Sequence, residues 1–216
     1  MNPVVIGARV HSGWAAVLAV SGDPEEDPCG VEVLDRRRMA IVDSAVVGAN
    51  QPYHFAENLE LPDAEKYLAN CAAVSERLAS AAIREMAQEL QIRDYQVAGS
   101  AIVLAAGRPL PGLADILASH ALIHTAEGEF FRTALRQACE GQGIPVTGIR
   151  QHDLEARAKG LFGSAANRLE KCIAGLGRSL GPPWTEDQKT AALAAWIVLA
   201  DLCGHTYSQR PSASVD

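Results

Sequence analysis

Short apolar runs rich in β-branched residues alternate with longer amphipathic runs along most of this chain, a pattern that is typical of an α/β protein. The pattern predicts five strands, over residues 4–8, 13–20, 31–42, 96–105 and 144–149. Only short connections separate the first three, so we expect them to form an antiparallel meander. The run 96–105 has few polar residues, which favours a central strand that is buried on both faces.

Helical spacing of apolar residues predicts helices over residues 64–91, 112–140, 153–163 and 185–203. Residues 164–180 also have a helical pattern, which Gly175 and Gly177 weaken in its second half. Asp63 is the expected N-cap of the first, and Thr185 with Gln188 forms a capping box for the last. We expect residues 46–61 to be an irregular connection. No second-domain boundary is visible, so the sequence predicts one domain over 1–204, followed by a polar tail over 205–216.

The helix predicted over 112–140 carries its most informative residues in the middle of its apolar face. His120, His124 and Glu127 fall within an arc of about 60°, since each helical residue advances about 100°. Buried ionisable groups are costly unless they are paired, hydrogen-bonded or metal-bound. Three interpretations stay open: a divalent-metal site, metal-free acid–base catalysis or ligand binding with Glu127 orienting a histidine, and structural polar packing.

Charge and cysteine usage narrow the class of protein. The net charge is −7, which argues against a general phosphate-binding surface and therefore disfavours a nucleic-acid partner. Five scattered cysteines without a C-x-x-C pair fit a reducing compartment, so we expect a cytoplasmic protein with free thiols. No run is long and apolar enough for a membrane span.

The order of predicted elements resembles the ribonuclease H-like fold. The opening, Val5-Ile6-Gly7-Ala8-Arg9 followed by Gly13-Trp14-Ala15-Ala16-Val17, is similar to that of resolvase-type and related members, and the final helix from Glu186 to Ala195 is similar to their closing helix. The resemblance implies an α/β fold with a three-strand antiparallel meander, then alternating helices and parallel strands, in a mixed five-stranded sheet with helices on both faces. It also implies a nuclease centre, in which carboxylates from the first strand, the fourth strand and the last helix hold divalent metal ions.

The sequence departs from that catalytic pattern. Arg9 occupies the first-strand position, the run 96–105 has no acid, and Thr190 stands at the last-helix position, with Asp187 one turn earlier. A standard two-metal nuclease centre is therefore not expected, because hard cations need several oxygen ligands.

Several residues could instead bind a ligand where the parallel strands end, the edge at which open α/β sheets gather their sites. These candidates are Arg9, His11, Arg108, Trp184, Asp187 and Lys189. We expect His120, His124 and Glu127 to face the same edge as catalytic residues, with the same three as the candidate metal ligands.

Three functional hypotheses follow. The first is a ribonuclease H-like protein with a His/Glu/Arg cleft for hydrolysis or for binding a phosphate ester or nucleotide, with a divalent metal not favoured. The second is a non-catalytic relative that binds a partner or itself, which leaves a homodimer open and predicts an extended apolar surface. The third is a metal-dependent nuclease with a rearranged centre.

Overall fold

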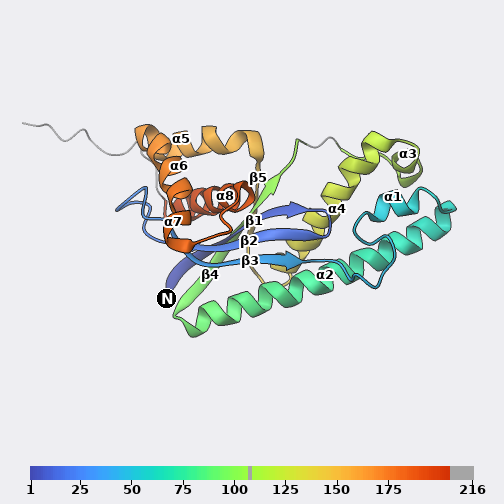
Figure 1. The fold of residues 1–216 in the computed structure, drawn as a ribbon, viewed down its shortest axis with the longest axis horizontal. Helices are drawn as coiled ribbons and strands as arrows, with labels where there is room; N and C mark the ends of the chain where they lie inside the picture. The colour runs from blue at the N-terminus through green and yellow to red at the C-terminus, as the bar shows by residue number, and fades with distance from the viewer. Residues whose placement is uncertain (107–108, 205–216) are drawn as a thin grey trace, which may run out of the picture.

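One mixed sheet forms the middle of the computed structural model, which describes residues 1–106 and 109–204. Its order is β3-β2-β1-β4-β5, where β1 pairs antiparallel with β2 and parallel with β4. The bounds are β1 Asn2–His11, β2 Trp14–Ser21, β3 Glu32–Ala40, β4 Tyr95–Leu104 and β5 Val146–Arg150. The sheet confirms the predicted meander and the two parallel strands that follow it (Figure 1).

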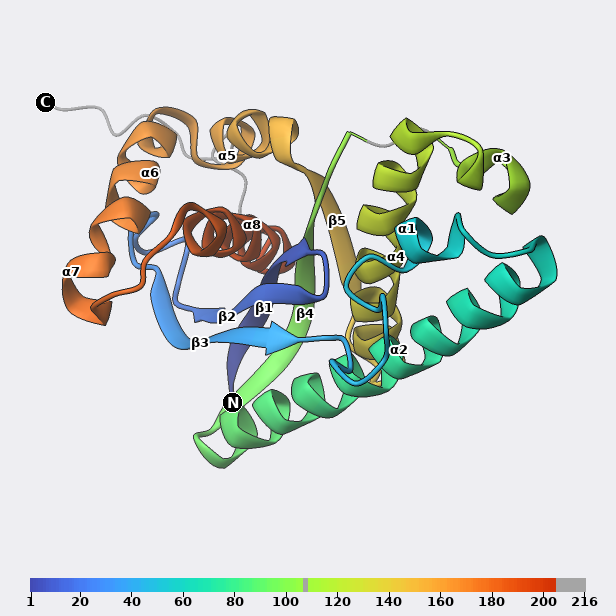
Figure 2. The same cartoon turned by 45° about the vertical axis from the view of Figure 1, so that its right-hand side comes forward.

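Helices cover both faces of the sheet, as Figure 2 shows. On one side lie α2 (Leu61–Ile92) and α4 (His120–Glu140), and on the other lie α5 (Leu154–Phe162), α6 (Ala166–Gly175) and α8 (Glu186–Leu202). Shorter elements connect them: α1 (Pro52–Ala56), α3 (Leu113–Leu117), α7 (Gly177–Leu180) and the 3₁₀ turns η1 (Gln151–Asp153) and η2 (Gly163–Ala165).

The central strands are apolar on both faces because both faces are covered. Alternate residues of β1 serve different cores: Val5 packs on the α8 side, whereas Val4 and Ile6 pack on the α2–α4 side. By the same alternation Arg9 and His11, farther along β1, face α8.

Helix α8 lies close to β1 at Gly7. A Cβ atom added there would lie 2.1 Å from the backbone oxygen of Ala191 in α8. Only glycine therefore lets α8 lie this near the strand.

Helix α8 begins with the predicted capping box, in which Gln188 Oε1 accepts from the backbone N–H of Thr185 at 2.9 Å and Thr185 accepts from the N–H of Gln188.

The predicted helix over 112–140 is in fact two helices. Helix α3 ends at Leu117 and α4 begins at His120, because Ser119 is extended, with φ −135° and ψ 110°. The first long helix also differs, since α2 begins at Leu61 with Pro62 in its first turn, where the missing N–H is tolerated, and Asp63 is not its N-cap. The connection expected to be irregular contains α1.

The three consecutive arginines of β3 lie on an edge strand but all have partners. Arg36 donates to the backbone oxygens of residues 180–183, including Leu180 at 2.7 Å. Arg37 pairs with Asp35 and Glu89. The turn after α7 and a face of α2 therefore reach the charges of this edge strand.

None of the helices in the described ranges combines the length and the hydropathy that a bilayer crossing requires.

Candidate functional site

Two of the predicted ligand residues, Arg9 and His11, meet the acid of the last helix at the carboxyl end of β1. His11 Nε2 lies 2.9 Å from Oδ1 of Asp187, and Arg9 Nε lies 3.8 Å from the same oxygen. The side chains are a quarter to a third exposed. Asp187 sits in the first turn of α8, where the helix dipole also favours a negative charge.

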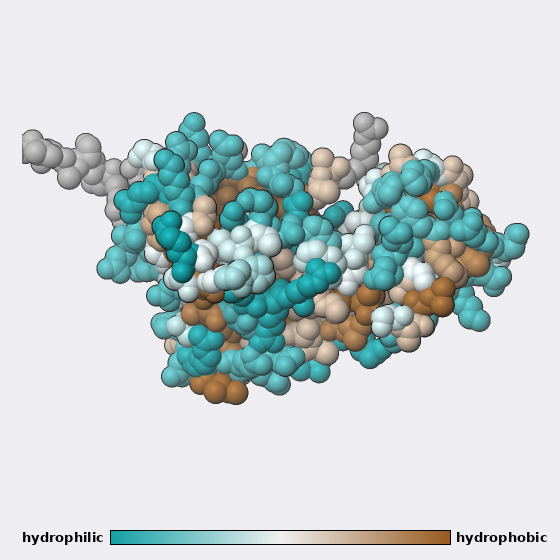
Figure 3. All heavy atoms as spheres, in the orientation of Figure 1, coloured by the Kyte–Doolittle hydropathy of each residue, from teal (hydrophilic) through white to brown (hydrophobic). Residues whose placement is uncertain are grey.

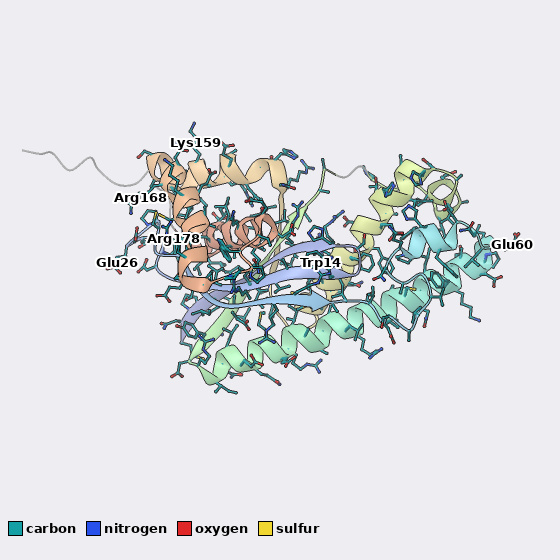
Figure 4. All side chains as sticks on the ribbon, viewed as in Figure 1. Trp14, Glu26, Glu60, Lys159, Arg168 and Arg178 are labelled. Atoms are coloured by element: carbon teal, nitrogen blue, oxygen red, sulfur yellow. The ribbon has the colours of Figure 1, made fainter. Side chains whose placement is uncertain are left out.

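A row of stacked groups continues from this ion pair across the sheet. The ring of His11 stacks on Trp14 with centroids 4.4 Å apart and planes 13° apart, and the guanidinium carbon of Arg38 lies 3.6 Å from the Trp14 ring centroid. Figure 4 labels Trp14 near the β1–β2 turn. On the other side Arg9 donates to Gln151 Oε1 of η1. Since the protein's own groups flank the indole, Trp14 holds the edge together and is not free to stack on a ligand.

This edge lacks the carboxylate set of a two-metal nuclease. Neither β1 nor β4 contains an aspartate or glutamate. Arg9 and His11 both contact the same oxygen of Asp187, Oδ1, so this carboxylate already has partners on β1.

A hollow of about 410 Å³ lies where β4 and β5 end, on the α4 side of the sheet. Its polar lining consists of Arg150 from the end of β5 and of Thr125, Glu129 and Arg132 from α4. Arg132 is only 7% exposed, and its Nε and Nη2 both lie 3.1 Å from Glu129 Oε2. Arg150 is exposed and has no hydrogen bond or ion pair to another described side chain. Two arginines against one glutamate give the lining one excess positive charge.

A second cluster lies on another side of α4, where α1 packs against it. His120 and His124 are exposed, one turn apart, with their Nε2 atoms 3.0 Å apart. His54 of α1 completes the cluster, and its ring centroid is 5.4 Å from that of His120 and 4.8 Å from that of His124. Within the described ranges, these three residues form the group whose donor atoms converge closely enough for a metal ion, all within 4.8 Å of one another.

Glu127 lies behind this cluster and is 3% exposed. Its Oε1 accepts from the backbone N–H groups of Tyr53 and His54, at 2.9 and 3.1 Å, and is 3.1 Å from His54 Nδ1. Its Oε2 is buried without a hydrogen-bond partner. Burial raises the pKa of Glu127 above that of an ordinary carboxyl group, and the contacts with His54 and Tyr53 oppose that shift only in part.

Two solved structures with a similar architecture are of Thermus thermophilus RuvC. RuvC from T. thermophilus in complex with a Holliday junction substrate is 11% identical, with a TM-score of 0.54, and the match covers 94% of this chain and 98% of that one. A second Thermus thermophilus RuvC structure is 12% identical over the same coverage, with a TM-score of 0.50. The fold is ribonuclease H-like. No protein-family model and no curated protein matches the sequence.

On this ribonuclease H-like scaffold the predicted site residues fall into two groups. Arg9, His11 and Asp187 meet at the end of β1, while His120 and His124 meet His54 beside α1. No hydrogen bond or ion pair between described residues joins the groups. The expectation of one shared cleft was wrong, because the helix break at Ser119 and the packing of α1 give the histidines a surface of their own.

The other predicted ligand residues have different positions. Trp184 donates its indole N–H to the backbone oxygen of Ile173 at 2.9 Å and packs against the core, so it is a packing residue. Lys189 forms an ion pair of 2.6 Å with Glu186, away from Asp187. Arg108 lies outside the described residues.

Three polar residues of these sites were missed from the sequence. His54 falls in a stretch that lacked periodicity, and only its partners on α4 give it a role. Arg132 and Arg150 border the hollow, and Arg150 had a usable signal because it directly follows a predicted strand.

Proposed function

We propose that this protein binds a phosphate ester, with a nucleic-acid backbone as the favoured ligand, at the ends of β4 and β5, and that it does not cleave the ligand by two-metal chemistry. The observation that carries the proposal is the hollow lined by Arg132 and Arg150. Arginine suits this ligand because its planar fork of N–H groups matches two phosphate oxygens.

The charge distribution supports the choice of an anionic ligand in spite of the net charge of −7. No carboxylate of the described residues pairs with Arg150, and Glu129 contacts Arg132 through Nε and Nη2, while no described group is bonded to its Nη1. A buried, oriented guanidinium costs little further entropy when it binds an anion. The site is therefore basic locally, and phosphate binding depends on the local field.

The solved neighbours support nucleic acid over a free nucleotide, because one RuvC complex contains a Holliday junction substrate. The lack of further carboxylates supports binding without two-metal hydrolysis, since β1 and β4 contain no aspartate or glutamate and hard cations need several oxygen ligands.

The test is equilibrium binding of fluorescent four-way junction, duplex and single-stranded DNA to the full chain at low salt. We expect Arg150→Gln to weaken binding of the preferred DNA about tenfold, the loss for one good phosphate contact. Arg178→Gln removes an exposed arginine from α7, far from the hollow (Figure 4), and we expect it to leave the affinity unchanged. Each substitution removes one positive charge, so the two variants have equal net charges. The comparison therefore separates the loss of a local contact from a change in overall charge.

Equal weakening by both substitutions, or no binding by the wild type, would contradict the proposal. Magnesium-dependent cleavage of the DNA would contradict the part of the proposal that excludes two-metal cleavage.

The competing hypothesis of a partner-binding relative has less support, because the large exposed apolar side chains in the described part of the chain are few, namely Met1, Val47, Leu61, Ile92 and Leu202. Hydrophilic residues cover most of the face drawn in Figure 3.

A further inference from the structure

We propose that His54, His120 and His124 form a mononuclear site for a divalent transition-metal ion, best suited to zinc, and that Glu127 is its positioning residue. The site goes beyond the proposed phosphate binding and uses none of its residues.

The geometry of the three imidazoles is close to that of a zinc site. Tetrahedral zinc with bonds of about 2.0–2.1 Å places its ligand nitrogens about 3.3 Å apart. The Nε2 atoms of His120 and His124 are 3.0 Å apart, and the third donor lies within 4.8 Å of both. Side-chain rotations that shift His54 by up to about 1.5 Å would complete the set. The i, i+4 spacing on α4 fixes the first pair on one side of the helix.

Glu127 prepares His54 for metal binding. Its Oε1 lies 3.1 Å from Nδ1, so an N–H at that nitrogen donates a hydrogen bond to the carboxylate and the other ring nitrogen keeps a lone pair that can bind a metal ion. The same oxygen accepts from the backbone N–H of His54 and holds the start of α1 in place. A carboxylate behind a ligating histidine is the usual outer partner of a metal site.

The unpartnered oxygen of Glu127 is the second, independent observation. A buried carboxylate oxygen without a hydrogen bond is costly, and α1 and α4 leave Oε2 in that state. A dication held through His54 would lie one imidazole away and would offset the cost of burying this negative charge.

The donor set also selects the class of metal and its coordination. Imidazole nitrogens suit zinc and neighbouring late first-row ions, whereas magnesium and calcium require oxygen ligands. No fourth histidine, cysteine, aspartate or glutamate of the described ranges has a donor within the same 4.8 Å group. Since His120 and His124 are exposed, a fourth position would be open to water, as in sites with three protein ligands.

The test is zinc titration of the full, tag-free chain, followed by X-ray absorption at the zinc edge. We expect one tightly bound zinc per chain, a nitrogen shell at about 2.0–2.1 Å, and no uptake of magnesium. His124→Gln should weaken zinc binding by at least about 100-fold, beyond the 10- to 100-fold loss expected for Glu127→Gln, which removes only an outer partner. His152→Gln is the matched control, because His152 is exposed in η1 and pairs with Asp153.

Circular dichroism checks the fold of every variant, and His120→Gln replaces His124→Gln if the latter unfolds. Equal zinc affinity in the wild type and in the ligand variants overturns the site. A Glu127→Gln variant that folds and binds zinc as tightly as the wild type overturns the role of Glu127. Arg150→Gln should bind zinc normally, so this result and the DNA-binding result can fail separately.

Discussion

Asp187 illustrates how one side chain can decide what chemistry an edge supports. Its carboxylate sits at the start of α8 and is held by His11 and Arg9 from β1. The guanidinium of Arg9 supplies a positive charge beside this carboxylate. An acid in this situation stabilises the junction between the strand and the helix, and it is unsuited to gathering hard cations.

Replacing this acid should therefore affect stability and leave ligand binding intact. We expect Asp187→Asn to lower the free energy of unfolding by about 1 kcal/mol, as for a partly exposed ion pair with a helix-dipole contribution. DNA affinity should stay the same or rise slightly, because a negative charge near the edge is removed. Urea unfolding and DNA titration measure the two effects, and loss of DNA binding without loss of stability would contradict this account.

Helix α4 is the element that carries both candidate sites. His120 and His124 lie on the side that faces α1, while Thr125 and Glu129 lie about 100° and 140° around the helix from His124 and line the hollow. Farther along the same helix, apolar residues such as Phe131 and Leu135 anchor it to the sheet. The helix thus separates a surface of imidazole side chains from a hollow lined by arginines.

Helix α8 packs closely against β1 at Gly7, and this contact leads to a prediction about stability. Gly7→Ala should lower the free energy of unfolding by about 3 kcal/mol, because its Cβ would meet a backbone oxygen that cannot move without the helix. Gly160→Ala is the matched control, since nothing lies within 4 Å of its added Cβ in α5, and it should stabilise the protein by up to about 1 kcal/mol. Chemical denaturation measures both, and equal effects would rule out the steric explanation.

At the scale of the whole molecule, an acidic protein presents a small basic hollow. The balance differs from that of a protein with a broad basic face, because the cationic residues that line the hollow in the described part of the chain are Arg132 and Arg150. Acidic surroundings repel a polyanion from the rest of the surface, so binding depends on few contacts.

This balance predicts a shallow salt dependence. With about two phosphate contacts, the slope of log affinity against log salt should be about −1.8, which corresponds to roughly tenfold weaker binding between 50 and 200 mM salt. Titrations at four or more salt concentrations measure the slope. A slope steeper than about −5 would mean that a much larger basic surface takes part and would contradict a site confined to the hollow.

The sequence by itself determined the class of fold and the order of its elements. Apolar runs of strand length, helical periodicity and the Thr185–Gln188 capping box are local signals, and each is encoded by residues within a few positions of one another. The sequence also showed that the runs forming β1 and β4 contain no aspartate or glutamate. It singled out His120 and His124, because ionisable residues interrupt an apolar face there.

Only the tertiary structure decided which of those groups meet. In the tertiary structure the predicted helix is interrupted at Ser119, and His54, from a connection without periodicity, lies beside His120 and His124. Asp187 contacts Arg9 and His11. The tertiary structure also leaves Glu127 with one satisfied oxygen and one unpartnered oxygen. These contacts join residues as many as 178 positions apart, from Arg9 to Asp187, and depend on how helices pack, which no local pattern encodes.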